Sequence, residues 1–142
     1  MTIGKHCKHD VVTAPRDTSV YKAAQLMKQH NIGNIVVIDK SDGITPIGIL
    51  TDRDVAIKIV ADEIDPRQLT IGDAMSQDLL ILREHQDIQE AIDMMCAKKV
   101  RRAPIADQQN KIIGIVTIDD LILLFADEFA SVAKLIRQQI FK

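Results

Sequence analysis

The sequence predicts an α+β fold made of two βαββα repeats that pack sheet to sheet around a pseudo-twofold axis. Two pairs of similar stretches carry this prediction. TIGKHCKHD at residues 2–10 matches TIGDAMSQD at 70–78, and GILTDRD at 48–54 matches GIVTIDD at 114–120. Both halves also show the same order of helical and extended patterns between these stretches, which marks a duplicated unit.

Each repeat is expected to contain one amphipathic helix after its first strand. Apolar residues recur there with the spacing i, i+3, i+4, i+7 that defines one helix face. These residues are Val20, Ala23, Ala24 and Met27 in the first repeat, and Ile88, Ala91, Ile92 and Met95 in the second. Asp17, Thr18 or Ser19 can cap the first helix, and Asp87 with Glu90 has the spacing of a capping box for the second.

Two short apolar runs separated by a polar turn follow each helix and predict a pair of strands. The predicted strands are residues 35–38 and 47–50 in the first repeat, and 103–106 and 113–116 in the second. Closing helices are expected over roughly 52–60 and 118–140. We therefore assign residues 1–69 to the first repeat with its connector, and 70–142 to the second repeat with a long C-terminal helix. One repeat buries little surface alone, so we expect the two sheets to share one core.

The composition disfavours several functional classes. The formal net charge is −2, and the 142 residues include no Trp, one Tyr and three Phe, so neither charge nor aromatic stacking favours nucleic acid. The apolar runs are too short to span a bilayer, and the start MTIGKHCKHD lacks the apolar segment of a signal peptide. The two cysteines, Cys7 and Cys96, form no CxxC pair, which fits a cytoplasmic location.

Motifs typical of enzymes are not found. The sequence has no GxSxG, HExxH, phosphate-loop or GxGxxG motif, so we expect no enzyme, no catalytic residue and no required cofactor. His6, Cys7 and His9 lie close together in sequence, as metal ligands often do. Cys7 aligns with Met75 of the second repeat, however, so we interpret Cys7 as a small buried apolar residue and expect no metal site.

The repeated Thr-x-x-Asp sequence, Thr51 with Asp54 and Thr117 with Asp120, has two interpretations. Thr followed three residues later by an acidic side chain is a capping box at a helix start. The glycine before each of these strand ends also leaves room for a ligand near the backbone. A helix start with a free hydroxyl suits a phosphate or ribose oxygen, and a carboxylate there can accept both hydroxyls of a ribose.

These residues resemble the cystathionine β-synthase (CBS) domain pair, also called a Bateman module. The resemblance rests on TAPRDTSVYKAAQLMKQHNIGNIVVID with GILTDRD, and on ILREHQDIQEAIDMMCAKKVRRAPIAD with GIVTIDD. It implies clefts that bind adenosine compounds such as AMP, ADP, ATP, S-adenosylmethionine or NAD, and a regulatory role. Because the pair fills the chain, we expect a stand-alone pair whose output passes through another protein or through its own oligomer.

The resemblance also implies roles for single residues. The implied ribose acceptors are Asp54 and Asp120, and the implied hydroxyl donors to ribose or phosphate are Thr51 and Thr117. The stretches whose backbone meets the adenine edge are Thr13, Ala14, Ile81 and Leu82. Those that line the base or phosphate are Asn34, Ile35, Arg102, Ala103 and Pro104.

Two differences between the repeats predict unequal clefts. Val36 stands where the second repeat has Pro104, and Arg53 stands where the second repeat has Asp119. Two unit charges about 4 Å apart interact by about 4 kcal/mol at an effective dielectric constant of 20, so arginine attracts a phosphate that aspartate repels. We therefore expect the first repeat's cleft to take the more phosphorylated ligand. The second is expected to bind weakly, to take an adenosine-like ligand or to stay empty.

Residues 98–102, KKVRR, form the one basic run. A solvated helix end explains the lysines, because cations suit the C-terminal end of a helix dipole. Phosphate binding is the preferred interpretation for Arg101 or Arg102, since a guanidinium matches phosphate oxygens. A nucleic-acid patch has no support beyond this run.

The last predicted helix would be about 35 Å long at 1.5 Å per residue. Its apolar residues are Leu121, Ile122, Leu124, Phe125, Phe129, Val132, Leu135, Ile136 and Ile140. So broad an apolar surface predicts a homodimer, the alternative being a helix that folds across its own sheet. Taken together, we expect a regulatory module that binds an adenine nucleotide and modulates an unidentified effector protein. The alternatives are a structural or dimerisation module without a ligand, and a sensor of S-adenosylmethionine or NAD.

Overall fold

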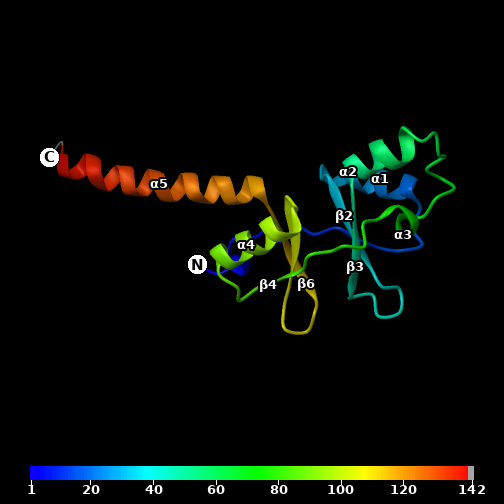
Figure 1. Cartoon of the computed structure of the whole chain (residues 1–142), viewed down its shortest axis with the longest axis horizontal. Helices are drawn as coiled ribbons and strands as arrows, with labels where there is room; N and C mark the ends of the chain where they lie inside the picture. The colour runs from blue at the N-terminus through cyan, green and yellow to red at the C-terminus, as the bar shows by residue number, and fades with distance from the viewer. Residues whose placement is uncertain (141–142) are drawn as a thin grey trace.

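The computed structural model of the protein describes residues 1–140 and contains two halves with the same order of elements (Figure 1). A 3-10 turn, η1 (Ile3–Lys5), precedes them. The first half comprises β1 (Thr13–Pro15), α1 (Val20–His30), β2 (Asn34–Ile38), β3 (Pro46–Thr51), α2 (Asp52–Asp54) and the π-helical turns η2 (Val55–Val60). The second comprises α3 (Ile71–Ala74), β4 (Leu82–Arg83), α4 (Ile88–Lys98), β5 (Arg102–Ala106), β6 (Ile112–Thr117) and α5 (Ile118–Ile140).

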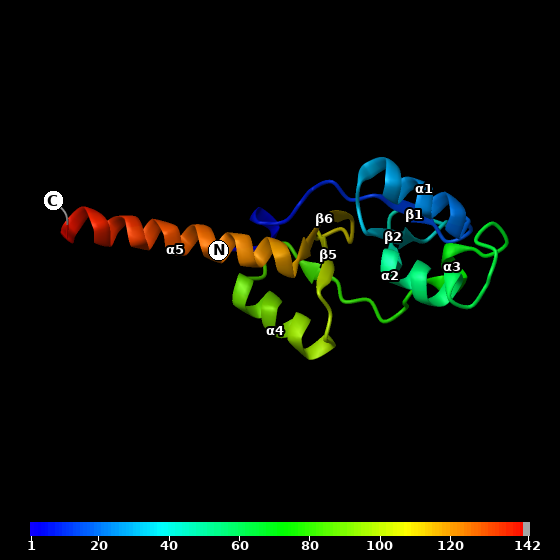
Figure 2. The ribbon, with the colours of Figure 1, turned by 90° about the horizontal axis from the view of Figure 1, so that it is seen from above.

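Each half contains one three-stranded sheet, ordered β1-β2-β3 in the first and β4-β5-β6 in the second. The first two strands of each sheet are parallel, and the last two are antiparallel. The sheets lie next to each other in the middle of the body, with α1 and α4 on the outer sides (Figures 1 and 2). Val36 and Pro104 are fully buried, yet they alternate with the residues that face the helices. They therefore face the opposite half, and the predicted fold class is confirmed.

The two halves do not share one core, and that expectation was wrong. One cluster of buried side chains fills the first half and a separate cluster fills the second. Each cluster includes a segment from the other repeat: Ile3 and Cys7 pack into the second half, whereas Ile71 and Met75 pack into the first. Each sheet thus covers its apolar helix-facing side with its own helix and the exchanged segment.

Backbone hydrogen bonds fix both exchanged segments against the last strand of a sheet. Lys8 and Ile115 exchange bonds of 3.1 and 2.9 Å, and Ser76 and Ile49 exchange bonds of 3.2 and 3.0 Å. A Cβ on Gly114 would come within 2.7 Å of the Lys8 carbonyl oxygen, and one on Gly48 within 2.8 Å of the Ser76 carbonyl oxygen. The glycines that we expected to make room for a ligand therefore make room for the chain's own exchanged segments.

The helices begin as the sequence indicates. Ser19 caps α1 by accepting the Lys22 N–H at 3.0 Å, and Asp87 caps α4 by accepting the Glu90 N–H at 2.8 Å. The helix expected at about 52–60 starts at Asp52 but continues as π-helical turns.

The helix α5 covers the predicted residues 118–140, and Figure 1 shows that it projects away from the body instead of folding across a sheet. The alternative prediction, that this helix folds across its own sheet, was therefore wrong. Among the residues that the structure describes, no helix is long and apolar enough to cross a membrane.

Candidate functional site

Thr51 and Asp54 lie where β3 passes into α2, beside the start of β2. Thr51 pairs with Asn34 in the sheet, so the ends of these two strands stand together. The Thr51 hydroxyl oxygen accepts the Asp54 N–H at 3.1 Å, and Asp54 Oδ2 accepts the Thr51 N–H at 3.0 Å. These two bonds form a capping box, which places a hydroxyl and a carboxylate side by side at the helix start.

The second half repeats this geometry. Thr117 pairs with Arg102 at the equivalent place in its sheet. The Thr117 hydroxyl accepts the Asp120 N–H at 3.2 Å, and Asp120 Oδ2 accepts the Thr117 N–H at 3.1 Å. The capping-box interpretation is thus confirmed in both halves. Because each box uses only one carboxylate oxygen, the ribose role remains open and stays a prediction.

A lysine ammonium lies against the second carboxylate oxygen of each box. Lys58 Nζ is 3.4 Å from Asp54 Oδ1, and Lys8 Nζ is 3.3 Å from Asp120 Oδ1. The Asp side chains are mostly covered, with 20% exposure for Asp54 and 11% for Asp120, whereas Lys8 is 70% and Lys58 47% exposed. Our sequence reasoning missed both lysines. The i, i+4 spacing could have indicated Lys58, but Lys8 reaches Asp120 only because its segment is exchanged between the halves.

Each box therefore offers three groups to a ligand. The threonine hydroxyl accepts one N–H and still has its own proton to donate. The outer carboxylate oxygen can accept hydroxyl protons, as a ribose would present. The neighbouring ammonium can pair with a phosphate. A hydroxyl-rich, anionic ligand would satisfy all three at once.

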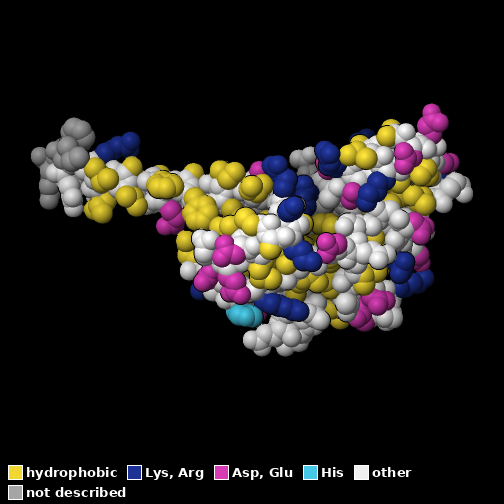
Figure 3. All heavy atoms as spheres, viewed as in Figure 1, with side chains coloured by type: hydrophobic (Ala, Val, Ile, Leu, Met, Phe, Trp, Pro, Cys, Tyr) yellow, Lys and Arg dark blue, Asp and Glu magenta, His cyan; other side chains and the backbone are white. Residues whose placement is uncertain are grey.

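Arg102 reaches from the second half toward the first box. Its Nη1 lies 3.5 Å from where a Cβ on Gly33 would stand, and Asp52 Oδ2 lies 3.0 Å from the same point. Gly33 directly precedes β2 and accepts the Asp52 N–H at 2.9 Å through its carbonyl oxygen. Arg102 is half-buried, whereas Arg53 and Arg101 are exposed. Figure 3 shows basic side chains gathered between the halves, near the place where α5 leaves the body.

The remaining predicted site residues differ in what they can present to a ligand. Thr13 is exposed, and Ile81 is half-buried just before β4. The buried ones are Ala14, Ile35, Leu82, Ala103 and Pro104. Four of these five side chains belong to the two apolar clusters, Pro104 being the one outside them. A ligand at these positions would therefore meet backbone atoms, which is the contact that the resemblance implies for Ala14 and Leu82.

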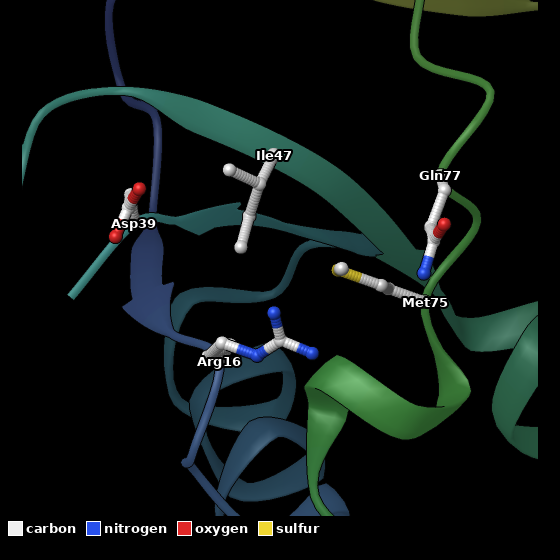
Figure 4. A pocket seen from close by; sticks show the side chains of 5 residues that line it. All are labelled: Arg16, Asp39, Ile47, Met75 and Gln77. Atoms are coloured by element: carbon white, nitrogen blue, oxygen red, sulfur yellow. The ribbon is translucent and has the colours of Figure 1, made fainter.

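Two cavities lie at opposite ends of the first sheet. One of about 390 Å³ lies beside the starts of β1 and β2 and is lined by His9, Asp10, Val11, Val12, His30 and Ile32. The other, of about 360 Å³, lies at the far end and is lined by Arg16, Asp39, Ile47, Met75 and Gln77 (Figure 4). The Arg16 guanidinium points into that second cavity, opposite the side chain of Ile47 (Figure 4). The first cavity is the one at the same end of the sheet as Thr13 and Thr51.

Cys7 is a buried apolar residue, as its alignment with Met75 predicted. It packs in the apolar cluster of the second half, and burial raises the pKa of its thiol. His9 Nδ1 lies 3.0 Å from the carbonyl oxygen of Ile113. Within residues 1–140, no three His, Cys, Asp or Glu side chains converge in a way that would hold a metal ion. In the basic run, Lys98 pairs with Asp78 at 2.9 Å, as suits a solvated helix end.

Comparison with known proteins identifies this architecture. A family model described as the CBS domain matches residues 3–61 and 71–127. The chain belongs to the CBS domain family. The two matched segments correspond to the two halves, so the chain contains a CBS pair. The predicted membership is confirmed.

Individual proteins are similar to this chain along most of its length. An uncharacterized protein of Methanopyrus kandleri is 37% identical over 123 residues, which cover 86% of this chain but only 61% of that protein. Hypoxic response protein 1 of Mycobacterium tuberculosis is 32% identical over 123 residues, or 85% of this chain and 78% of that protein. Its crystal structure, which has two coordinated zinc ions, matches with a TM-score of 0.73 at 30% identity, covering 86% and 97% of the two chains.

A solved CBS pair with bound ligands has the same fold. The CBS domain pair of protein MJ0100, in complex with 5′-methylthioadenosine and S-adenosylmethionine, matches with a TM-score of 0.78. The match covers 90% of this chain and 98% of that chain at 23% identity. At this identity, the likeness shows the shared fold.

Proposed function

We propose that this CBS pair is a non-catalytic sensor that binds an adenine nucleotide through its ribose and passes the bound state to a partner protein. One observation carries the proposal: each half holds a threonine hydroxyl and an aspartate carboxylate side by side, with a lysine ammonium at the free carboxylate oxygen. That trio matches a ribose followed by a phosphate. The adenosine compounds bound by the MJ0100 pair support the same ligand class.

The charges near the boxes favour a phosphorylated ligand over S-adenosylmethionine. Lys8, Lys58 and Arg102 bring positive charge to the ends of the strands. Phosphate oxygens gain from these cations, whereas the sulfonium of S-adenosylmethionine is itself a cation and is repelled. AMP, ADP and ATP are therefore the preferred candidates, with S-adenosylmethionine or NAD as the alternative. The cavity beside Thr13 offers Val11, Val12 and Ile32 as apolar neighbours for the base.

The two sites are still expected to take ligands with different numbers of phosphates, but for a different reason than the one based on Arg53 and Asp119. Asp119 still stands where the first half has Arg53, but Lys8 now supplies a cation to the second box. Arg102, from the second half, lies near the first. We propose that the first site takes the more phosphorylated ligand because Lys58 and Arg102 act there together. The second site, with Lys8, takes a ligand with fewer phosphates.

The partner and the location also belong to this proposal. A ligand-induced change in the arrangement of the halves would be read by an effector protein, and we propose that the chain acts as a homodimer in the cytoplasm. The buried thiol of Cys7 and the free thiol of Cys96 suit a reducing compartment. The competing function, from a different class, is a structural module whose sites stay empty.

A thermal-shift panel with AMP, ADP, ATP, S-adenosylmethionine and NAD tests the proposal. A ligand present at one hundred times its dissociation constant should add about 2.7 kcal/mol to the free energy of unfolding. Stabilisation by one or more adenine nucleotides, and not by GTP used as a control, is the expected result. If no adenosine compound raises the melting temperature at millimolar concentration, the structural-module alternative is correct.

A further inference from the structure

The helix α5 exposes apolar side chains from Ile118 to Ile136. Beyond its first two turns it leaves the body, and Figure 3 shows apolar side chains spread along the projecting part. Phe129, near the middle, is 76% exposed. An isolated helix gains little stability in water, and a solvent-exposed apolar face adds a cost in hydration. We therefore expect another polypeptide segment to pack along the helix and bury this apolar face.

Most of the exposed apolar residues follow a heptad pattern. Six of the eight large ones are separated alternately by four and three residues, namely Ile118, Ile122, Phe125, Phe129, Val132 and Ile136. The other two, Leu123 and Leu135, lie off this pattern. This alternation continues over three heptads and is the seam of a left-handed coiled coil. A helix that packed on a globular surface would need a wider stripe of period 3.6. The pattern thus indicates that the segment packed against this face is another helix.

The charges of α5 indicate which helix fits and in which direction. Its first half carries acidic residues only: Asp119, Asp120, Asp127 and Glu128. Its second half, through Ile140, carries basic residues only: Lys134 and Arg137. Four of these side chains make no ion pair among the described residues, namely Asp127, Glu128, Lys134 and Arg137. Asp127 and Lys134 lie at the outer position of the heptad and do not meet across the seam. An antiparallel pair nevertheless aligns the acidic half of one helix with the basic half of the other and opposes the two helix dipoles, whereas a parallel pair aligns like charges and like dipoles.

We propose that α5 forms an antiparallel coiled coil with α5 of a second copy of this chain. Heptad register then pairs Phe129 with Val132 of the second copy, Phe125 with Ile136, and Ile122 with Gln139, around a twofold axis between residues 130 and 131. This inference goes beyond ligand binding and specifies the homodimer proposed above. The side chain of Ile140, which we predicted to belong to this apolar surface, lies outside the described residues.

An apolar groove at the base of α5 continues the same seam. It has a volume of about 170 Å³ and is lined by Ile92, Met95, Cys96, Lys99, Val100, Ile118 and Leu121. Ile118 belongs both to this groove and to the heptad seam. In the antiparallel arrangement, the last turn of the second copy's helix reaches the level of Leu121, at the edge of this groove. The coiled coil would then join the helix tip of one copy to the body of the other.

Light scattering on the purified chain tests the assembly. We expect a dimer at about 50 µM, a monomer for Phe129→Lys, and a dimer for the matched control Ala130→Lys, which lies outside the seam. Circular dichroism shows whether each variant is folded, and a calorimetric titration with AMP, performed separately, tests the ligand proposal independently. A monomeric parent, or a dimeric Phe129→Lys, overturns the coiled coil whatever the titration gives.

Disulfide trapping in a Cys96→Ser background tests the direction. In the antiparallel pair, Ile122→Cys combined with Gln139→Cys should cross-link two chains readily under mild oxidation. Ile122→Cys alone should not, because its two copies would be about 25 Å apart at 1.5 Å per residue, far beyond the reach of a disulfide. Efficient cross-linking of the single variant would establish a parallel pair and overturn the proposed direction.

Discussion

Replacing Asp120 by asparagine separates the two roles of this carboxylate. In the structure, Oδ2 accepts the Thr117 N–H at 3.1 Å, and Oδ1 faces Lys8 at 3.3 Å. The amide oxygen of asparagine can keep the first bond, so the helix start remains capped. Its NH₂ group cannot accept a hydroxyl proton, so a ribose loses its acceptor. Alanine would be a poorer choice, because losing the cap itself costs about 1 kcal/mol.

The expected loss of affinity follows from the strength of the missing bond. A hydrogen bond to a charged acceptor contributes about 1.5–3 kcal/mol, which corresponds to roughly a 10- to 150-fold rise in dissociation constant. The ion pair with Lys8 adds little to stability because Lys8 is 70% exposed. We therefore expect the melting temperature of the unliganded Asp120→Asn variant to stay close to that of the parent.

Calorimetry with AMP is the assay, and Asp62→Asn, at an exposed carboxylate of the connector, is the control. The same substitution at Asp54 tests the first site. If Asp54→Asn and Asp120→Asn each bind AMP at every site as the parent does, both carboxylates serve only as helix caps and the ribose assignment is wrong.

Four further predictions concern the exchanged segments and the two cysteines. Lys8→Met should weaken AMP binding at the second site more than adenosine binding, measured by calorimetry; equal losses would show that Lys8 does not contact the phosphate. Gly114→Ala should destabilise the fold by about 1–3 kcal/mol in urea unfolding, because the new Cβ meets the Lys8 carbonyl oxygen at 2.7 Å. An unchanged free energy of unfolding would argue against the exchanged packing. A thiol reagent should modify exposed Cys96 quickly and buried Cys7 only on unfolding. Because burial raises the pKa of Cys7, the stability gained from its neutral thiol should be full below the unfolded pKa of about 8.5 and should decline as pH rises through the higher folded value.

The sequence was sufficient for the local parts of this fold. Helix faces such as Val20, Ala23 and Met27 follow a short period, and a cap such as Ser19 acts within one helical turn. The duplicated stretches then gave the pairing of strands in both halves, since the same pattern folds the same way twice. The capping boxes at Thr51 and Thr117 were predictable for the same reason.

Non-local packing could not be predicted in this way. Residues 2–10 and 70–78 are similar, so each can pack on either half, and nothing in their local pattern says that they are exchanged. The contact between Lys8 and Asp120 depends on that exchange and was missed with it. The apolar side chains of α5 were visible in the sequence, but their periodicity alone did not tell whether the helix would cover its own sheet.

The most direct test of the central claim compares AMP with 2′-deoxy-AMP in calorimetric titrations of the unmodified chain. The two ligands share the base and the phosphate, and they differ only in the ribose hydroxyl that the aspartate carboxylate is proposed to accept. We predict that AMP binds at least tenfold more tightly than its deoxy analogue, in line with one charge-assisted hydrogen bond. Equal affinities for the two ligands, or no binding of either, would contradict ribose recognition by the Thr-x-x-Asp boxes.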